Sequence, residues 1–224
     1  MDVFSDPDNQ ELFLTGFSWI LRLTGISAAL ALVLGVLLAA MRVSPVPVLR
    51  GIGTVWVNTF RNTPLTLIIV FCNLGLFSTL GLKLSDDIAL NNFWLSVIGL
   101  SAYTAAFVCE AVRSGINTVP AGQAEAARAI GLTFAQTLRI VVLPQAGRAV
   151  IAPLGSILIA LTKNSTIAGV IGVAEAANAM KVLINDNGDA VIAIFLVFAG
   201  TFVALLVPTG YFFNWLGNRL AVRR

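Results

Sequence analysis

Residues 12–41 read LFLTGFSWILRLTGISAALALVLGVLLAAM, thirty residues among which Arg22 is the only charged one. A helix that crosses a bilayer needs about 20 mostly apolar residues, so this stretch predicts a transmembrane helix. It is too long for the apolar region of a secretory signal peptide, and the residues before it are acidic where a signal peptide is basic. We therefore expect this segment to stay in the membrane.

The composition of the whole chain agrees with a membrane protein. Of the 224 residues, 58% are apolar and 11% are charged, whereas soluble domains carry about 25% charged residues. This composition excludes a free cytosolic enzyme and a disordered chain, and a dispersed net charge of +3 forms no basic stripe for a nucleic acid. The absence of histidine excludes a histidine base or zinc site, and we expect Cys72 and Cys109 to be buried structural thiols.

Four further apolar stretches predict membrane spans, at 64–80, 88–112, 150–173 and 190–216. The semi-polar residues 44–62 predict a membrane-surface or kinked helix. Thr63-Pro64 predicts a break after Arg61, because proline lacks a backbone N–H.

The charges set the orientation of these spans. Ten of the fourteen cations fall between spans one and two, between spans three and four, or after span five, and cytoplasmic loops carry the excess of Lys and Arg. We therefore predict an all-α integral membrane protein with five transmembrane helices, its N-terminus outside and its C-terminus in the cytoplasm. We expect a single membrane domain over residues 1–224, placed as a multi-pass protein in the bacterial plasma membrane.

The long internal segment 113–148 contains its own helix signals. Alanine-rich residues 121–130 predict a short helix, and Gly131 stands where a left-handed residue would end it. Thr133 and Gln136 have capping-box spacing for a second helix, which we expect Pro144 to stop. The resulting helix-turn-helix could be a docking surface for another protein or an amphipathic helix on lipid.

Several short motifs in this chain resemble one protein family. Within the internal segment, Glu125-Ala126-Ala127, Gly131, Ile140 and Leu143-Pro144 are similar to the EAA loop of ABC-importer permeases. The wider match, over residues 12–220, resembles the polar amino-acid (His/Glu/Gln/Arg) branch of these permeases, and actinobacterial glutamate-uptake permeases above all. It is carried by four stretches in order: Phe60–Leu65 (with Asn62 where glycine is usual), Pro120–Gln123, Leu143–Ala146 and Leu161–Thr166.

The resemblance implies partners and an arrangement. Such a permease pairs with a second permease subunit, identical or homologous, and with a dimer of ATP-binding subunits, and it receives its amino acid from an extracytoplasmic binding protein. ATP and Mg would bind the partner ATPase, since this sequence has no G-x-x-x-x-G-K-[ST] motif, and we expect no catalytic residue or cofactor on this chain. The resemblance implies that a cytoplasmic coupling helix between spans 3 and 4 docks on the ATPase through Gly122, Gln123, Glu125, Ala126, Ala127, Gly131, Leu143 and Pro144.

Charges inside the spans are candidates for the transport path. Lys163 lies about thirteen residues into the fourth span, where a charge is costly and should face a cavity or partner. The alternatives are that it snorkels or pairs with Glu110. We interpret Glu110 itself as a structural partner of Arg113, three residues away. The path candidates are Lys163, Asn164, Ser165, Thr166 and Arg22.

A cation in the path favours an anionic substrate, so we expect glutamate or aspartate. The alternative is a neutral or basic amino acid such as glutamine or arginine. An intramembrane enzyme lacks the clustered acids and histidines that it would need. An ATP-independent carrier or channel remains a remote alternative, and the EAA loop favours an importer over an exporter.

Overall fold

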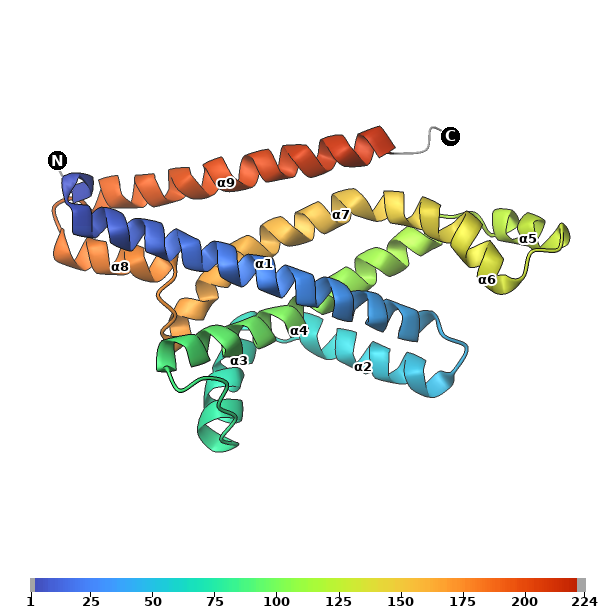
Figure 1. The fold of residues 1–224 in the computed structure, drawn as a ribbon, viewed down its shortest axis with the longest axis horizontal. Coiled ribbons are helices and arrows are strands. Elements are labelled where there is room, and N and C mark those ends of the chain that lie inside the picture. Colours follow the sequence, from blue (N-terminus) through green and yellow to red (C-terminus); the bar gives the residue numbers. More distant parts are fainter. Residues whose placement is uncertain (1–2, 221–224) are drawn as a thin grey trace.

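The computed structural model describes residues 3–220, which form an elongated bundle of helices (Figure 1). Four helices are long and apolar enough to cross a membrane, and a bent pair would make a fifth crossing. The elements are η1 (Val3–Ser5), α1 (Pro7–Val43), α2 (Pro47–Asn62), α3 (Leu65–Val70), η2 (Phe71–Thr79), α4 (Ile88–Asn117), α5 (Ala121–Ala129), α6 (Phe134–Gln136), η3 (Thr137–Val142), α7 (Leu143–Asn164), η4 (Ser165–Ile171), α8 (Ala176–Asp186) and α9 (Val191–Leu220). The all-helical membrane class is thus confirmed, with four or five candidate spans.

The predicted second span is one arm of a broken helix. The break at Thr63–Pro64 is confirmed, and the axes of the two arms, residues 47–62 and 65–79, differ by 107°. This bend agrees with the kinked-helix alternative for residues 44–62, and α2 packs along α1 and α4 with its Val57 fully buried. Residues 64–80 alone are not among the candidate spans, and the two arms together make the possible fifth crossing.

Small residues allow α1 and α4 to approach closely, and this pair has the most extensive packing in the bundle. Ala31 and Ala39 of α1 and Ala105 and Ala106 of α4 lie fully buried in one apolar cluster with Cys109. Close approach through small residues is the usual way in which membrane helices associate, because lipid offers no hydrophobic driving force. Both cysteines are free and buried, as expected.

The helix signals of the internal segment are confirmed. Helix α5 ends before Gly131, whose φ of +93° is left-handed. Thr133 and Gln136 form the complete capping box, with the Thr133 N–H donating to Gln136 Oε1 at 2.8 Å and the Gln136 N–H donating to Thr133 Oγ1 at 3.3 Å.

Pro144, however, does not stop the second helix of this segment. Residues 134–171 form one continuous candidate span, so the fourth span begins well before residue 150. A proline normally clashes with the carbonyl four residues earlier. Here it follows the π-helix η3, in which the Leu143 N–H bonds to Leu138 O, five residues back. This wider turn gives the proline ring room.

The structure adds one helix that the sequence interpretation missed. Residues 176–186, assigned to a loop between spans four and five, form α8, which packs on α1. Its Ala176 and Ala179 approach Gly16 so closely that a Cβ there would lie 2.9 Å from the Ala179 Cβ.

A matched pair of glycines in α1 tests the helix packing. A Cβ on Gly35 would lie 2.5 Å from the Val108 Cβ and 2.9 Å from the Ala105 carbonyl oxygen, whereas one on Gly25 would meet nothing within 4 Å. We expect Gly35→Ala to destabilise the purified chain by about 1–3 kcal/mol through overpacking. Gly25→Ala should be neutral or slightly stabilising, because alanine is the better helix former. Thermal unfolding in detergent measures both, and equal midpoints for the two variants would contradict this packing.

Candidate functional site

Lys163 lies in the last turn of α7, where the helix continues into the 3-10 helix η4. Its side chain is exposed and, with Thr166, lines a groove of about 820 Å³. The groove runs between α7 with η4 on one side and α9 on the other, and the α9 side is mostly apolar, with Tyr211 and Asn214 among its lining residues. Lys163 is the only charged residue that lines the groove within residues 3–220. The groove can therefore attract an anion.

The other polar residues of this stretch do not share the groove. Asn164 lines a second, smaller cavity of about 240 Å³ between α4 and α7, together with Tyr103, Phe107 and Ser156. Ser165 is fully buried, and its hydroxyl donates to Thr162 O at 2.8 Å. The structure thus brings Lys163 and Thr166 together and directs Asn164 to another face of the helix.

Arg22 does not line the Lys163 groove. It is exposed on α1, with its guanidinium carbon 5.5 Å from the centre of the Trp19 ring. The groove is lined by α7, η4 and α9, so Arg22 is not one of its residues.

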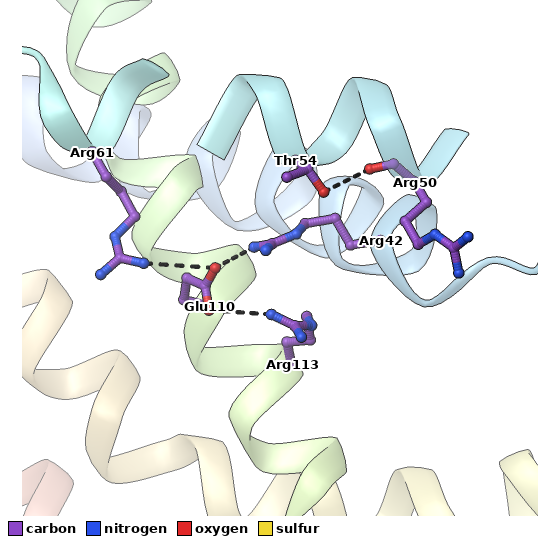
Figure 2. A network of polar contacts seen from close by, with 6 residues as sticks. All are labelled: Arg42, Arg50, Thr54, Arg61, Glu110 and Arg113. Atoms are coloured by element: carbon purple, nitrogen blue, oxygen red, sulfur yellow. Dashed lines mark hydrogen bonds and ion pairs between the residues drawn. The ribbon is translucent and has the colours of Figure 1, made fainter. Parts of the chain in front are cut away.

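Glu110 is the centre of a charge cluster that links three helices (Figure 2). The predicted contact with Arg113 is present, with 3.6 Å between Arg113 Nη1 and Glu110 Oε2. Arg42 from α1 donates a hydrogen bond to Glu110 Oε1, and Arg61 from α2 lies 3.6 Å from the same oxygen. Among the described residues these three arginines are the ion-pair partners of Glu110, so the alternative of a Glu110–Lys163 pair is wrong.

The expected docking segment is largely exposed. Gly122, Gln123, Glu125, Ala126, Gly131, Leu143 and Pro144 are all solvent-accessible. Apolar side chains beside them are also exposed, with Ile130 at 81%, Phe134 at 76% and Ile140 at 61%. Ala127 instead is buried against its own chain. Gln145 ties α5 to α7 by donating to Gln123 Oε1 at 2.6 Å. This uncovered apolar surface is suited to contact with another protein.

The sequence interpretation did not single out Glu175, which follows the predicted fourth span. Glu175 is fully buried at the N-terminus of α8, where its carboxylate accepts the N–H groups of Ala177 at 2.7 Å and Asn178 at 3.0 Å. Gly169 of η4 makes room for it, since a Cβ there would lie 2.5 Å from Glu175 Oε1. A glutamate directly before an alanine-rich segment was the available signal, although Glu is not among the preferred N-cap residues.

Burial raises the pKa of Glu175 from 4.5 to about 7, against the lowering effect of its two backbone donors and of Lys181. Glu175 lies in the connection after the 134–171 helix, outside the candidate spans. Its carboxyl group, which caps α8 and lies against Gly169 of η4, therefore changes charge near neutral pH.

Because the pKa of Glu175 is raised in the folded chain, the stability of the fold should depend on pH. Between about pH 4.5 and 7 the folded chain keeps a proton on Glu175 that the unfolded chain has lost, so this group's contribution to stability falls as pH rises through that window. We expect the unfolding midpoint of the wild type to fall relative to that of Glu175→Gln between about pH 5 and 8. Thermal unfolding across this range measures it, with Glu125→Gln, an exposed glutamate, as the control. Parallel pH profiles of the wild type and Glu175→Gln would contradict the titration.

Known proteins resemble this chain over nearly its whole length. The sequence model of the family described as binding-protein-dependent transport system inner membrane component matches residues 31–222. The chain is 50% identical over 212 residues to the glutamate transport system permease protein GluC of Corynebacterium efficiens, covering 92% of this chain and 93% of the relative. It is 35% identical to the probable glutamine ABC transporter permease protein GlnM of Bacillus subtilis, covering 95% of each.

A solved structure shares the fold. A crystal structure of an amino acid ABC transporter with histidines matches with a TM-score of 0.86 and 25% identity, covering 98% of this chain and 99% of the other. The family match spans most of the helices described above, including both grooves, the charge cluster and the exposed segment around α5. This chain therefore belongs to the inner membrane components of binding-protein-dependent transport systems, and it is a multi-pass membrane protein.

Proposed function

We propose that this chain is the permease subunit of an ATP-driven importer that carries glutamate across the bacterial plasma membrane. The observation that supports glutamate most is the 50% identity to glutamate transport permeases from two Corynebacterium species. The Lys163 groove agrees with it, because its single cation can pair with an acidic side chain or an α-carboxylate. Glutamine and arginine remain the alternatives, since relatives at 35% and 39% identity carry those names.

The proposed orientation places the N-terminus outside and the C-terminus in the cytoplasm. Figure 1 shows two ends of the bundle. One end holds the C-terminal ends of α1 and α4, the start of α2, and helices α5 and α6. The other end holds α8 and the N-terminus. Arg42, Arg113, Arg128 and Arg139 all belong to the first end, and an excess of Lys and Arg marks the cytoplasmic side. The last two arginines, Arg223 and Arg224, lie outside the described residues.

The proposed mechanism is alternating access driven by a separate ATP-binding dimer. The binding protein would deliver the amino acid on the outer side to a path formed with a second permease subunit. Helix α5 and the exposed side chains Ile130, Phe134 and Ile140 would seat on the ATPase. Closure of the ATPase would then move the 134–171 helix, whose far end bears Lys163. A ligand can shift such an equilibrium only by binding the two states differently.

The substrate is tested by reconstituting the permease with its ATPase and binding protein in lipid vesicles. We expect ATP hydrolysis to rise with glutamate and to rise less with aspartate, glutamine or arginine. A larger response to glutamine or arginine would reassign the substrate. No response to any amino acid would overturn the transport class.

Replacement of Lys163 tests the groove. We expect Lys163→Ala to reduce the rate of glutamate uptake about tenfold or more, because one charge-assisted contact with the substrate is lost. Basal ATP hydrolysis should stay near that of the wild type. Lys83→Ala removes an exposed lysine whose ion-pair partner among residues 3–220 is Asp86, and it should leave both activities unchanged. An equal loss of uptake and basal hydrolysis in Lys163→Ala would count against contact with the substrate.

Gly131 tests the docking of α5 on the ATPase. A Cβ on Gly131 meets nothing within 4 Å, but its φ of +93° is strained for most residues. We expect Gly131→Glu to uncouple ATP hydrolysis from uptake while the assembly survives, because a bulky charge would stand in the docking surface. Gly131→Asn is the control for strain, since Asn tolerates the left-handed conformation, and it should keep most of the uptake. Normal uptake in Gly131→Glu would refute the docking role.

A further inference from the structure

Helix η4 carries Thr166, one of the two polar residues that line the groove on this side, and is bonded to the other. The Thr166 hydroxyl donates to Lys163 O at 2.8 Å, so both residues belong to one turn of the chain. One face of η4 is buried in an apolar cluster, where Ala168 lies with Ile69 and Phe93. Apolar burial is non-directional, so it sets the register of η4 less strictly than a hydrogen bond does.

A buried asparagine of α4 bonds to the last carbonyl of η4. Asn92 is 8% exposed, and its Nδ2 donates to Ile171 O at 2.7 Å. The last carbonyls of a helix have no partner within that helix, so Asn92 completes the end of η4, directly before the left-handed Gly172. Within residues 3–220 this is the only hydrogen bond between η4 and a side chain of another helix.

The amide group of Asn92 is itself held in one orientation. Asn73 of η2 donates from its Nδ2 to Asn92 Oδ1 at 3.0 Å. A backbone carbonyl oxygen can only accept, so the Nδ2 of Asn92 must face Ile171 O, and its Oδ1 then faces Asn73. Asn92 therefore joins α4 both to η4 and to η2, the arm of the broken helix that follows Thr63–Pro64. A buried amide with both sides paired favours a single arrangement of the three elements.

We propose that Asn92 is a positioning residue for transport, which holds the end of η4 and so directs Lys163 and Thr166 into the groove between α7 and α9. The part in transport rests on the proposed function, in which Lys163 contacts glutamate, whereas the hold on η4 does not. The neighbouring Asn91 offers a matched control. It is 1% exposed, and its Oδ1 accepts the Leu84 N–H at 2.8 Å, which ties the connection before α4 rather than η4.

The hold on η4 is tested by hydrogen exchange and mass spectrometry on the purified full-length chain in detergent. Asn92→Leu keeps a side chain of similar size that cannot donate to Ile171 O. We expect the backbone amides of residues 165–173 to exchange about fivefold faster or more in this variant. Asn91→Leu should leave their exchange at the wild-type rate. Unchanged exchange of residues 165–173 in Asn92→Leu, or an equal increase in both variants, would overturn the hold.

A second variant serves if Asn92→Leu does not fold. Asn73→Leu removes the partner that orients the Asn92 amide, at a position that is only half-buried. It should speed exchange of residues 165–173 by a smaller factor, because the bond to Ile171 O is weakened rather than lost. Wild-type exchange of this segment in Asn73→Leu would then count against the proposal.

The part in transport is tested by a double-mutant cycle on glutamate uptake by the reconstituted transporter. We expect Asn92→Leu to lower the rate of uptake about threefold or more, and Asn91→Leu to leave it near that of the wild type. Because Asn92 acts through the lysine, adding Asn92→Leu to Lys163→Ala should cause little further loss. Losses that multiply in the double variant would mean that Asn92 acts independently of Lys163, which would overturn the positioning role.

Failure of this proposal and failure of the proposed function give different results. Full uptake in Lys163→Ala would refute contact between this lysine and glutamate, and with it the part of Asn92 in transport. The exchange measurement uses no substrate, so it still decides whether Asn92 holds η4. Reduced uptake in Lys163→Ala together with full uptake in Asn92→Leu would overturn the positioning role alone.

Discussion

The interior of a bilayer contains no water to solvate a charge or an open backbone group, and nearly every feature of this chain follows from that constraint. The backbone of residues 7–43, 88–117, 134–171 and 191–220 satisfies its hydrogen bonds within long helices. Two charged side chains within these helices have a partner or an opening beside them. Glu110 is surrounded by arginines from three helices, and Lys163 faces a groove.

The same constraint explains why small residues hold the bundle together. Without a hydrophobic force between helices in lipid, close contact and dispersion must supply the attraction. Gly35 lets α1 reach Val108 of α4, and Gly155 of α7 makes room for Phe213 of α9. Helix α9 shows the opposite extreme, because only 11% of its apolar window is buried within this chain. Its remaining surface is available to lipid or to another subunit.

Local signals in the sequence predicted the structure well, and long-range contacts were beyond them. Three features depend only on neighbouring residues, so each could be predicted from a short stretch of sequence. They are the break at Pro64, the left-handed Gly131, and the capping box of Thr133 and Gln136. The Glu110–Arg113 contact is of the same local kind, but Arg42 and Arg61 join it from 68 and 49 positions away, which no spacing rule predicts. The prediction that Pro144 ends a helix was wrong, because the π-helix before it has no sequence signature. The separation of Lys163 from Asn164 into two grooves depends on where α4 and α9 lie, and the burial of Glu175 depends on the space above Gly169.

The unbroken helix at residues 134–171 has a mechanical consequence. A flexible joint at Pro144 would have absorbed any push on Phe134 within a few residues. The helix instead continues to Lys163 without a non-helical segment, over roughly 45 Å at about 1.5 Å per residue. Two features interrupt its regular winding before Lys163: the wider π turn at residues 137–142, and Pro153 inside α7, which has no N–H to donate. In the mechanism proposed above, a displacement at Phe134 would therefore reach Lys163 as a movement of this helix, softened at the π turn and at Pro153.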